Sequence, residues 1–268
     1  MFPRLITLNI PEFLQGFLPA TLSLHSYGVM IALGVLASFY ITLHKSKKFG
    51  MDADRLSGMF IWVIVAAFVG GKLFFFLEDI DKYWGKYAAI KGAMGGGFVF
   101  YGSLIFAVPT IVWWLRKEKI PVRPFLDILA FVGPVVHSFG RVGCFLAGCC
   151  HGKVCDSWMG VTFTHPDSLA AFKNTALYPT QLFDIAVNLT ILAVIYFIQK
   201  KQKFSGQLFL IYLMMYGVGR SIVEIYRGDD ARGFLFGGAV SHSQFIAVCI
   251  ILICAVVWRK WSKVGNLN

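Results

Sequence analysis

Long apolar runs alternate with short polar segments along the chain. Seven such runs lie at residues 25–43, 57–77, 95–115, 125–146, 181–199, 207–227 and 240–257. Each is close to the roughly 20 residues that cross a bilayer as an α-helix. The pattern therefore predicts an all-α polytopic membrane protein with about seven transmembrane helices. Because we find neither an internal repeat nor an appended polar segment, we expect one integral membrane domain over residues 1–268.

Composition supports the same class of protein. Hydrophobic residues make up 57% of the chain and charged residues only 15%, and the mean hydropathy is +0.67. Soluble domains carry about 25% charged residues. Since no short apolar stretch with a small-residue cleavage site precedes the first run, we expect no removable signal peptide.

The positive charge, +11 overall, is concentrated in alternate connections between the runs. Of the 25 lysines and arginines, 14 lie at Arg55 and in the segments 44–48, 116–123, 199–203 and 258–263. Cytoplasmic loops of membrane proteins carry such an excess. The pattern predicts a periplasmic N-terminus and a cytoplasmic C-terminus, and it argues against nucleic acid as the partner.

Ionisable residues inside the sixth run are costly in a membrane and therefore indicate function. Tyr216, Arg220, Glu224 and Arg227 fall within roughly 80° of arc on one helical face. Arg220 and Glu224 have the i, i+4 spacing of an ion pair. A buried structural salt bridge would explain that pair, but two arginines facing one glutamate also leave a positive charge that favours an anion.

The fourth run repeats the pattern, because His137, Arg141 and Cys144 share a face that has no carboxylate of its own. Arg141, Arg220 and Lys72 lie roughly 20–24 Å along their helices from the cytoplasmic ends. Snorkelling to the headgroups is the alternative explanation, and it suits Lys72 and Arg227 best. A guanidinium group matches phosphate geometry. We therefore favour a phospholipid phosphate site in the outer half of the bilayer.

Further polar residues are expected at the same level. They are Tyr27 at the start of the first run, Tyr101 near the start of the third, and Gln181 and Asp184 at the start of the fifth. Tyrosines at this depth are also typical of the interfacial aromatic belt.

Four cysteines cluster around the end of the fourth run, with a histidine among them. They are Cys144, Cys149, Cys150 and Cys155, and the histidine is His151. Packing as free thiols, a disulfide on the oxidising side of the membrane, and a thiolate metal site all remain open. The spacing does not contain the paired C-x2-C of common zinc sites.

Five segments, in this order, resemble the bacterial prolipoprotein diacylglyceryl transferases: GGKL (70–73), FYGSL (100–104), GRVGCFLAGCCHG (140–152), YPTQLFD (178–184) and YGVGRSIVEIYR (216–227). The resemblance extends from HSYG in the first run to SHSQ in the last. It implies an enzyme of the bacterial inner membrane that moves the diacylglyceryl group of phosphatidylglycerol to the lipobox cysteine of a preprolipoprotein signal peptide. Glycerol 1-phosphate would leave, in the first step of lipoprotein maturation.

The resemblance also implies roles for individual residues. Arg141 and Arg220 would bind the departing phosphate, Glu224 would orient an arginine, and Tyr27 and Tyr101 would complete the catalytic set. The implied substrate-binding residues are Lys72, Gly140, Gly143, Cys144, Gly152, Gln181, Tyr216 and Arg227. No cofactor and no metal are implied, and the partners are the two substrates and membrane lipid.

Two departures from the family pattern bear on the chemistry. Tyr101 stands where many members have a histidine, so the base that takes the thiol proton would be His137 or His151, or the arginines would lower the pKa of the thiol. The signature GRxGNFxNxExxG has lost two asparagines and a glutamate to Cys144, Ala147 and Cys149. The alternative is a divergent paralogue that binds phospholipid, or a metal through the Cys/His cluster, without transfer.

Overall fold

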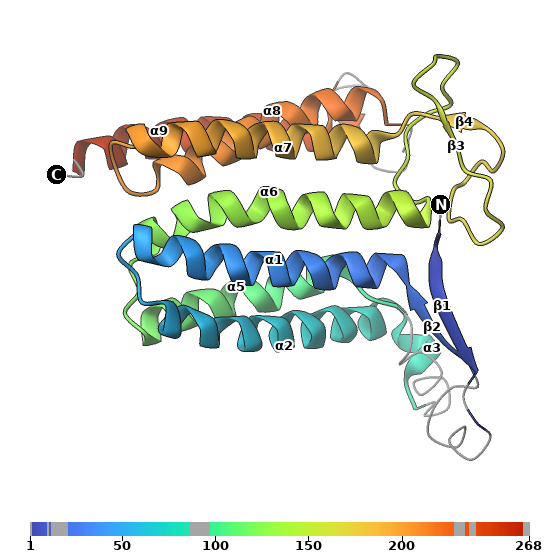
Figure 1. Cartoon of the computed structure of the whole chain (residues 1–268). Helices are drawn as coiled ribbons and strands as arrows, with labels where there is room; N and C mark the ends of the chain where they lie inside the picture. The colour runs from blue at the N-terminus through green and yellow to red at the C-terminus, as the bar shows by residue number, and fades with distance from the viewer. Residues whose placement is uncertain are drawn as a thin grey trace. The chain divides into compact units, whose positions relative to one another are not determined.

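Seven long helices dominate the computed structural model, which describes residues 2–9, 11, 21–85, 97–227, 234–235 and 240–264. In these residues the long helices are α1 (Ser26–Lys48), α2 (Ala53–Glu78), α5 (Phe100–Lys117), α6 (Val122–Ala147), α7 (Thr180–Ile198), α8 (Gln207–Ile225) and α9 (His242–Val264) (Figure 1). Each predicted apolar run overlaps one of them, and residues 95–96 of the third run lie outside the described residues.

The predicted fold class is confirmed. Six of the long helices are long and apolar enough to cross a membrane, and α5 is the exception among the described residues. It is only 18 residues long and ends with Arg116 and Lys117. Seven membrane crossings and the orientation of the termini stay predictions.

Short strands pair outside the long helices, and the apolar pattern did not predict them. The antiparallel pairs are β1 (Arg4–Asn9) with β2 (Thr21–His25), β3 (Val161–Thr162) with β4 (Ala176–Leu177), and β5 (Phe234–Leu235) with β6 (Val240–Ser241). In the first pair Arg4 lies opposite His25 and Asn9 opposite Thr21. The remaining short elements are α3 (Ile80–Tyr83) and the 3-10 helix η2 (Gln199–Lys201).

The chain divides into two compact units. The larger unit contains Met1–Ile41 and Leu126–Asn268, and the smaller one contains Thr42–Phe125. The single membrane domain expected from the sequence stays a prediction.

The smaller unit is built on the close packing of α2 against α5. A side chain on Gly70 would meet the carbonyl oxygen of Gly102, and a side chain on Gly102 would meet that of Gly70. The two backbones can approach only because both positions are glycine. The indole N–H of Trp114 also donates to the carbonyl of Arg55 at 2.8 Å, which ties the other ends of the helices together.

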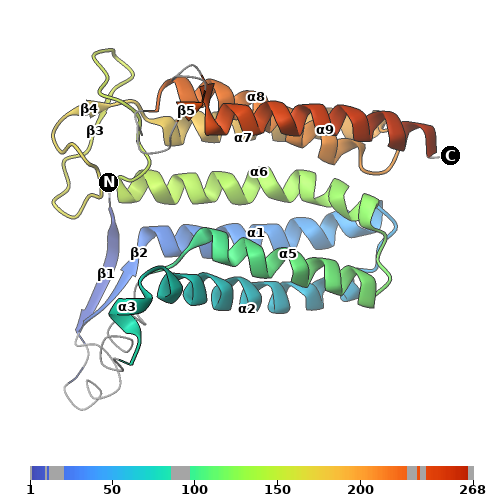
Figure 2. The ribbon, with the colours of Figure 1, turned by 180° about the vertical axis from the view of Figure 1, so that it is seen from behind.

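In the larger unit α7, α8 and α9 pack side by side (Figures 1 and 2). Helix α6 packs against the part of α1 that belongs to this unit. A Cβ on Gly34 of α1 would lie 3.0 Å from Cβ of Phe139 on α6. Helix packing through glycine brings α1 and α6 together at the level of Arg141.

The start of α8 is held by a carboxylate from another helix. Asp127 on α6 is fully buried and accepts hydrogen bonds from the backbone N–H groups of Gly206 (2.6 Å), Leu208 (2.9 Å) and Phe209 (3.4 Å). Gln202 Nε2 donates to the same carboxylate at 2.6 Å. These are N–H groups that a helix cannot satisfy itself. Asp127 therefore fixes the position of α8 relative to α6, and with it the height of Arg220.

Candidate active site

Arg141 lies on α6 and is held by side chains of its own and of a neighbouring helix. Its Nε atom lies 2.9 Å from Oδ2 of Asp184 on α7, and it donates to Nε2 of His137 at 3.1 Å. The Arg141 side chain is 15% exposed and the Asp184 side chain 2%. Asn188, one turn after Asp184, contacts Nδ1 of His137 at 3.4 Å and donates to the Asp184 carbonyl. The guanidinium group is therefore fixed from two sides.

Arg220 lies on α8, and its spacing to Glu224 produced the predicted ion pair. Nη2 of Arg220 and Oε2 of Glu224 are 2.5 Å apart, and the side chains are 11% and 9% exposed. Nη1 of Arg220 is buried and has no hydrogen-bond partner in the part of the chain that the structure describes. A buried N–H of a charged group without a partner is costly, so this atom favours an acceptor from a ligand.

Three arginines of the larger unit act on a common carboxylate. Asp184 interacts electrostatically with Arg141, Arg220 and Arg227, and Arg227 is itself buried. Among these described side chains, three guanidinium groups meet the two carboxylates of Asp184 and Glu224. The set carries a surplus positive charge in a buried setting, and such a setting suits an anion.

Tyr216 connects α8 to α6 beside Arg141. Its ring lies 5.3 Å from the imidazole of His137, centroid to centroid. Because His137 also contacts Arg141, the predicted residues of the fourth and sixth apolar runs form one cluster.

Tyr27 lies at the start of α1, against the signature of α6. A Cβ on Gly143 would lie 3.0 Å from Cδ2 and 3.2 Å from Cα of Tyr27, whereas a Cβ on Gly140 would meet only Ile31, at 3.8 Å. Tyr27 is 44% exposed and lines a cavity of about 560 Å³ together with Gly28, Ala147 and Cys149. Gly143 thus sets how close Tyr27 approaches α6.

The end of the signature folds onto the start of α7. Gln181 is fully buried and donates to the carbonyl of Cys149 at 2.7 Å, and Thr180 donates to that of Cys150 at 2.8 Å. The Gly152 N–H donates to the Tyr178 carbonyl at 2.8 Å. A Cβ on Gly152 would collide with the carbonyl oxygen of Tyr226, so only glycine fits there.

Three of the four clustered cysteines come together. The Sγ atoms of Cys144, Cys149 and Cys150 all lie within 4.8 Å of one another, while the Cys155 sulfur contacts Ser157. All six cysteines are free thiols. The pKa of the Cys150 thiol is lowered, because Cys144 and Cys149 hydrogen-bond to it and the charges of Arg141 and Arg227 stabilise its thiolate.

The two histidines proposed as bases are both engaged. Nε2 of His151 accepts from the Ala171 N–H at 3.2 Å, and Nδ1 lies 2.9 Å from the Gly152 carbonyl, to which it donates in that tautomer. Nε2 of His137 accepts from Arg141. Neither ring presents a vacant nitrogen to an incoming thiol in these arrangements.

Two predicted site residues, Tyr101 and Lys72, lie in the smaller unit and are described within it. The Tyr101 side chain is 74% exposed and its ring contacts Phe100. The Lys72 ammonium lies 5.6 Å from the ring centroid of Phe75. Their roles at the phosphate stay predictions.

Asp184, Asn188 and Asp127 were missing from the predicted site. The sequence indicates Asp184 only as a polar residue at the start of the fifth run, and it predicts no carboxylate on the helical face of Arg141. That expectation was right for α6 itself, but α7 supplies the carboxylate. Polar residues on successive helical turns of an apolar run, as in Asp184 and Asn188, were the available indication.

Comparison with known proteins identifies the family of the chain. A family model described as prolipoprotein diacylglyceryl transferase matches residues 17–260. The chain belongs to this family. It is 37% identical to the phosphatidylglycerol–prolipoprotein diacylglyceryl transferase of Clostridium tetani, over 89% of this chain and 93% of the relative. It is similar to enzyme 2 of that name from Clostridium perfringens (32%, covering 86% and 88%) and to the Finegoldia magna enzyme (25%, covering 88% and 91%). The resemblance drawn from the five segments is confirmed at the level of the family.

Proposed function

We propose that the chain is a phosphatidylglycerol–prolipoprotein diacylglyceryl transferase of the bacterial inner membrane. Membership of the family and the names of its relatives support the reaction. The observation that carries the chemistry is the pair of largely buried arginines, Arg141 and Arg220, on two helices around Asp184.

The reaction moves one group between two substrates. The acceptor sulfur forms a bond to the glyceryl carbon of the lipid, the bond from that carbon to the phosphate oxygen breaks, and glycerol 1-phosphate leaves with the electron pair. Negative charge therefore grows on the phosphate. Arg141 and Arg220 would stabilise that charge in a site with little water, where fixed donors are most effective.

The carboxylates would act as positioning residues. Asp184 forms an ion pair with Arg141, and Glu224 forms one with Arg220. Each guanidinium group would bind its carboxylate along one edge and the phosphate along the other. Arg227 adds charge from the end of α8. Tyr216 and Gln181 fix the helices and the signature loop around the same point.

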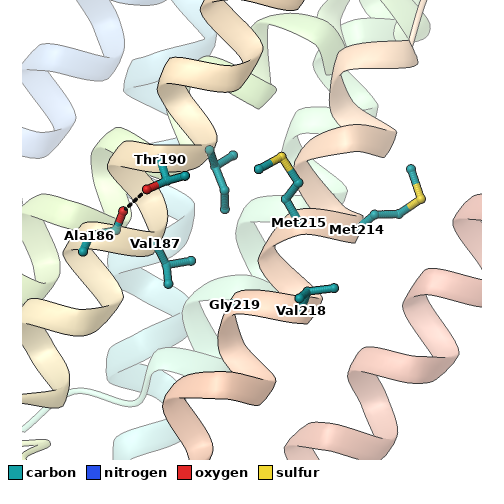
Figure 3. A pocket seen from close by; sticks show the side chains of 8 residues that line it. Ala186, Val187, Thr190, Met214, Met215, Val218 and Gly219 are labelled. Atoms are coloured by element: carbon teal, nitrogen blue, oxygen red, sulfur yellow. Dashed lines mark hydrogen bonds between the residues drawn. The ribbon is translucent and has the colours of Figure 1, made fainter.

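An apolar cavity of about 480 Å³ between α7 and α8 suits an acyl chain of the lipid (Figure 3). Val187, Met215 and Val218 line it, and its one hydroxyl, on Thr190, is bonded to the Ala186 carbonyl at 2.8 Å. Gly219, which lines it too, precedes Arg220 in the chain, so an acyl chain in the cavity would continue from a phosphate at the arginine. A side chain on Gly219 would meet Val187.

The finer localisation follows from the charge pattern. With the basic connections in the cytoplasm, the ends of α6 and α8 that carry the arginines would face the periplasm. Phosphatidylglycerol and the lipobox of a translocated preprolipoprotein are both available there.

The test is transfer by the purified protein in detergent, with phosphatidylglycerol labelled in its acyl chains and a lipobox peptide as acceptor. We expect label on the peptide and one glycerol 1-phosphate released for each peptide modified. A peptide with serine in place of the lipobox cysteine is the control and should stay unlabelled. Retention of phosphatidylglycerol by folded protein without either product would instead support a lipid-binding paralogue.

A further inference from the structure

The three-sulfur group has the dimensions of a metal site. Zinc binds thiolate sulfur at about 2.3 Å, so sulfurs around a tetrahedral zinc lie roughly 3.8 Å apart. The sulfurs of Cys144, Cys149 and Cys150 all lie within 4.8 Å of one another. A shift of less than about 1 Å per pair would reach zinc geometry.

The backbone holds these cysteines in place. The N–H groups of Gly148 and Cys149 donate to the Cys144 carbonyl at 2.9 and 3.1 Å, which closes the end of α6. Gly148 and Cys150 have positive φ angles of 82° and 62°, so the chain turns back toward the helix. The carbonyls of Cys149 and Cys150 are then fixed by Gln181 and Thr180. The grouping of the sulfurs is thus a property of the loop.

The charge around the group suits a metal bound by three thiolates. Zinc with three thiolates carries a net charge of −1, and both Arg141 and Arg227 interact electrostatically with Cys150. The positive charges of these two arginines would therefore balance the negative charge of a zinc ion bound by three thiolates.

Three protein ligands leave one tetrahedral position unfilled. His151 uses Nε2 and Nδ1 on backbone groups, and the Cys155 sulfur contacts Ser157. In the described ranges, no further histidine, cysteine or carboxylate belongs to the group. Cys149 lines the same cavity of about 560 Å³ as Tyr27, so a molecule in that cavity would have access to a metal bound by these sulfurs. Catalytic zinc sites keep such an open position.

We propose that Cys144, Cys149 and Cys150 bind one zinc ion and that its fourth position takes the acceptor thiol. The role of the fourth position rests on the proposed transfer; metal binding itself does not. On coordination the acceptor thiol gives its proton to solvent, because a metal-bound thiol is deprotonated. The zinc-bound sulfur then bonds to the glyceryl carbon as the carbon–oxygen bond to phosphate breaks, and the neutral thioether leaves the metal. The metal would thus deprotonate the acceptor thiol, which the hydrogen-bonded rings of His137 and His151 would not do.

Cobalt is the probe of the metal site, because cobalt bound by thiolates absorbs strongly and free cobalt does not. Reduced full-length protein, freed of metal by chelator, is titrated with Co²⁺. We expect thiolate charge-transfer absorption that saturates at one ion per chain. It should be lost in Cys144→Ser, Cys149→Ser and Cys150→Ser and kept in Cys249→Ser, a free thiol on α9. If the absorption is absent, or if it persists in the three variants, the proposed metal site is contradicted.

Folding is checked for each variant by size-exclusion profile and melting temperature. If one variant does not fold, zinc content measured by mass spectrometry of the intact wild-type protein gives an independent answer. One ion, removed by chelator, supports the site, and no ion bound after incubation with excess Zn²⁺ contradicts it.

The acceptor role has its own test. A lipobox peptide should shift the ligand-field absorption of the cobalt protein, and the serine peptide should not; equal spectra would overturn the role of the fourth position. Transfer that survives chelation unchanged would also overturn it while leaving the proposed function intact. Cobalt binding with no transfer under any metal condition would contradict the proposed function but not the metal site.

Discussion

Nε of Arg141 on α6 lies 2.9 Å from Oδ2 of Asp184 on α7, and the carboxylate is almost completely buried. This contact joins α6 and α7 at the guanidinium group of Arg141, whose orientation it fixes. A largely buried arginine with one edge fixed by a carboxylate can present its other edge to a phosphate in a single orientation.

Replacing Asp184 with asparagine should slow transfer. Asparagine has the same shape but lacks the charge, and a hydrogen bond to a charged group contributes about 1.5–3 kcal/mol. If that energy positions Arg141 in the transition state, kcat should fall by about 10- to 100-fold with a smaller change in KM. Asp54→Asn is the control, because Asp54 is an exposed aspartate in the smaller unit. Equal kcat for Asp184→Asn and wild type would contradict the positioning role.

Replacing Arg220 with lysine should also reduce the rate, although the charge is kept. Lysine cannot offer the planar fork of donors that binds both Glu224 and a phosphate oxygen. We expect a loss of about 10- to 100-fold in kcat/KM for phosphatidylglycerol, from one lost charge-assisted hydrogen bond. Steady-state rates over a range of lipid fractions in mixed micelles measure it. Full activity of Arg220→Lys would mean that charge alone is needed.

The two glycines that flank Arg141 should respond differently to alanine. A methyl group at Gly143 would lie 3.0 Å from Tyr27 and push α1 away, at a cost of about 1–3 kcal/mol for overpacking. A methyl group at Gly140 meets only Ile31, at 3.8 Å, and alanine favours the helix by about 0.5–1 kcal/mol. Melting temperatures in detergent should therefore fall for Gly143→Ala and not for Gly140→Ala. The reverse order would contradict the packing of α1 on α6.

Asp127→Ala should destabilise the larger unit. The change leaves the first N–H groups of α8 without their acceptor, and they are buried. Each bond to the charged carboxylate contributes about 1.5–3 kcal/mol, so the melting temperature should fall by several degrees or more. Asp167→Ala, an exposed aspartate, is the control. An unchanged melting temperature would show that α8 is fixed by its apolar contacts instead.

The sequence predicted the features that are determined within a single helix. The apolar runs gave the positions of the seven long helices, because length and composition decide which segments stay in a membrane. The Arg220–Glu224 pair was predicted because its members are four residues apart on one face. The short strands were missed, since two to six residues leave little pattern.

Contacts between helices could not be predicted from the sequence. The Arg141–Asp184 pair joins residues 43 positions apart, and no helical period relates them. Asp127 as the cap of α8 was missed for the same reason. The cysteine group depends on a turn through Gly148 and Cys150 with positive φ, so the spacing of the cysteines did not resemble a metal motif although their sulfurs lie together.

The central claim, that Arg141 meets the phosphate of the donor lipid, is tested most directly by comparing wild type, Arg141→Ala and Arg55→Ala. Arg55 is the matched control, because it is an exposed arginine whose ion pair with Asp52 lies in the smaller unit. The measurement is the initial rate of glycerol 1-phosphate release from phosphatidylglycerol, with folding checked by melting temperature. We predict a loss on the order of 10²–10³-fold for Arg141→Ala, as for removal of one transition-state donor, and little change for Arg55→Ala. A folded Arg141→Ala protein that releases glycerol 1-phosphate at the wild-type rate would contradict the account.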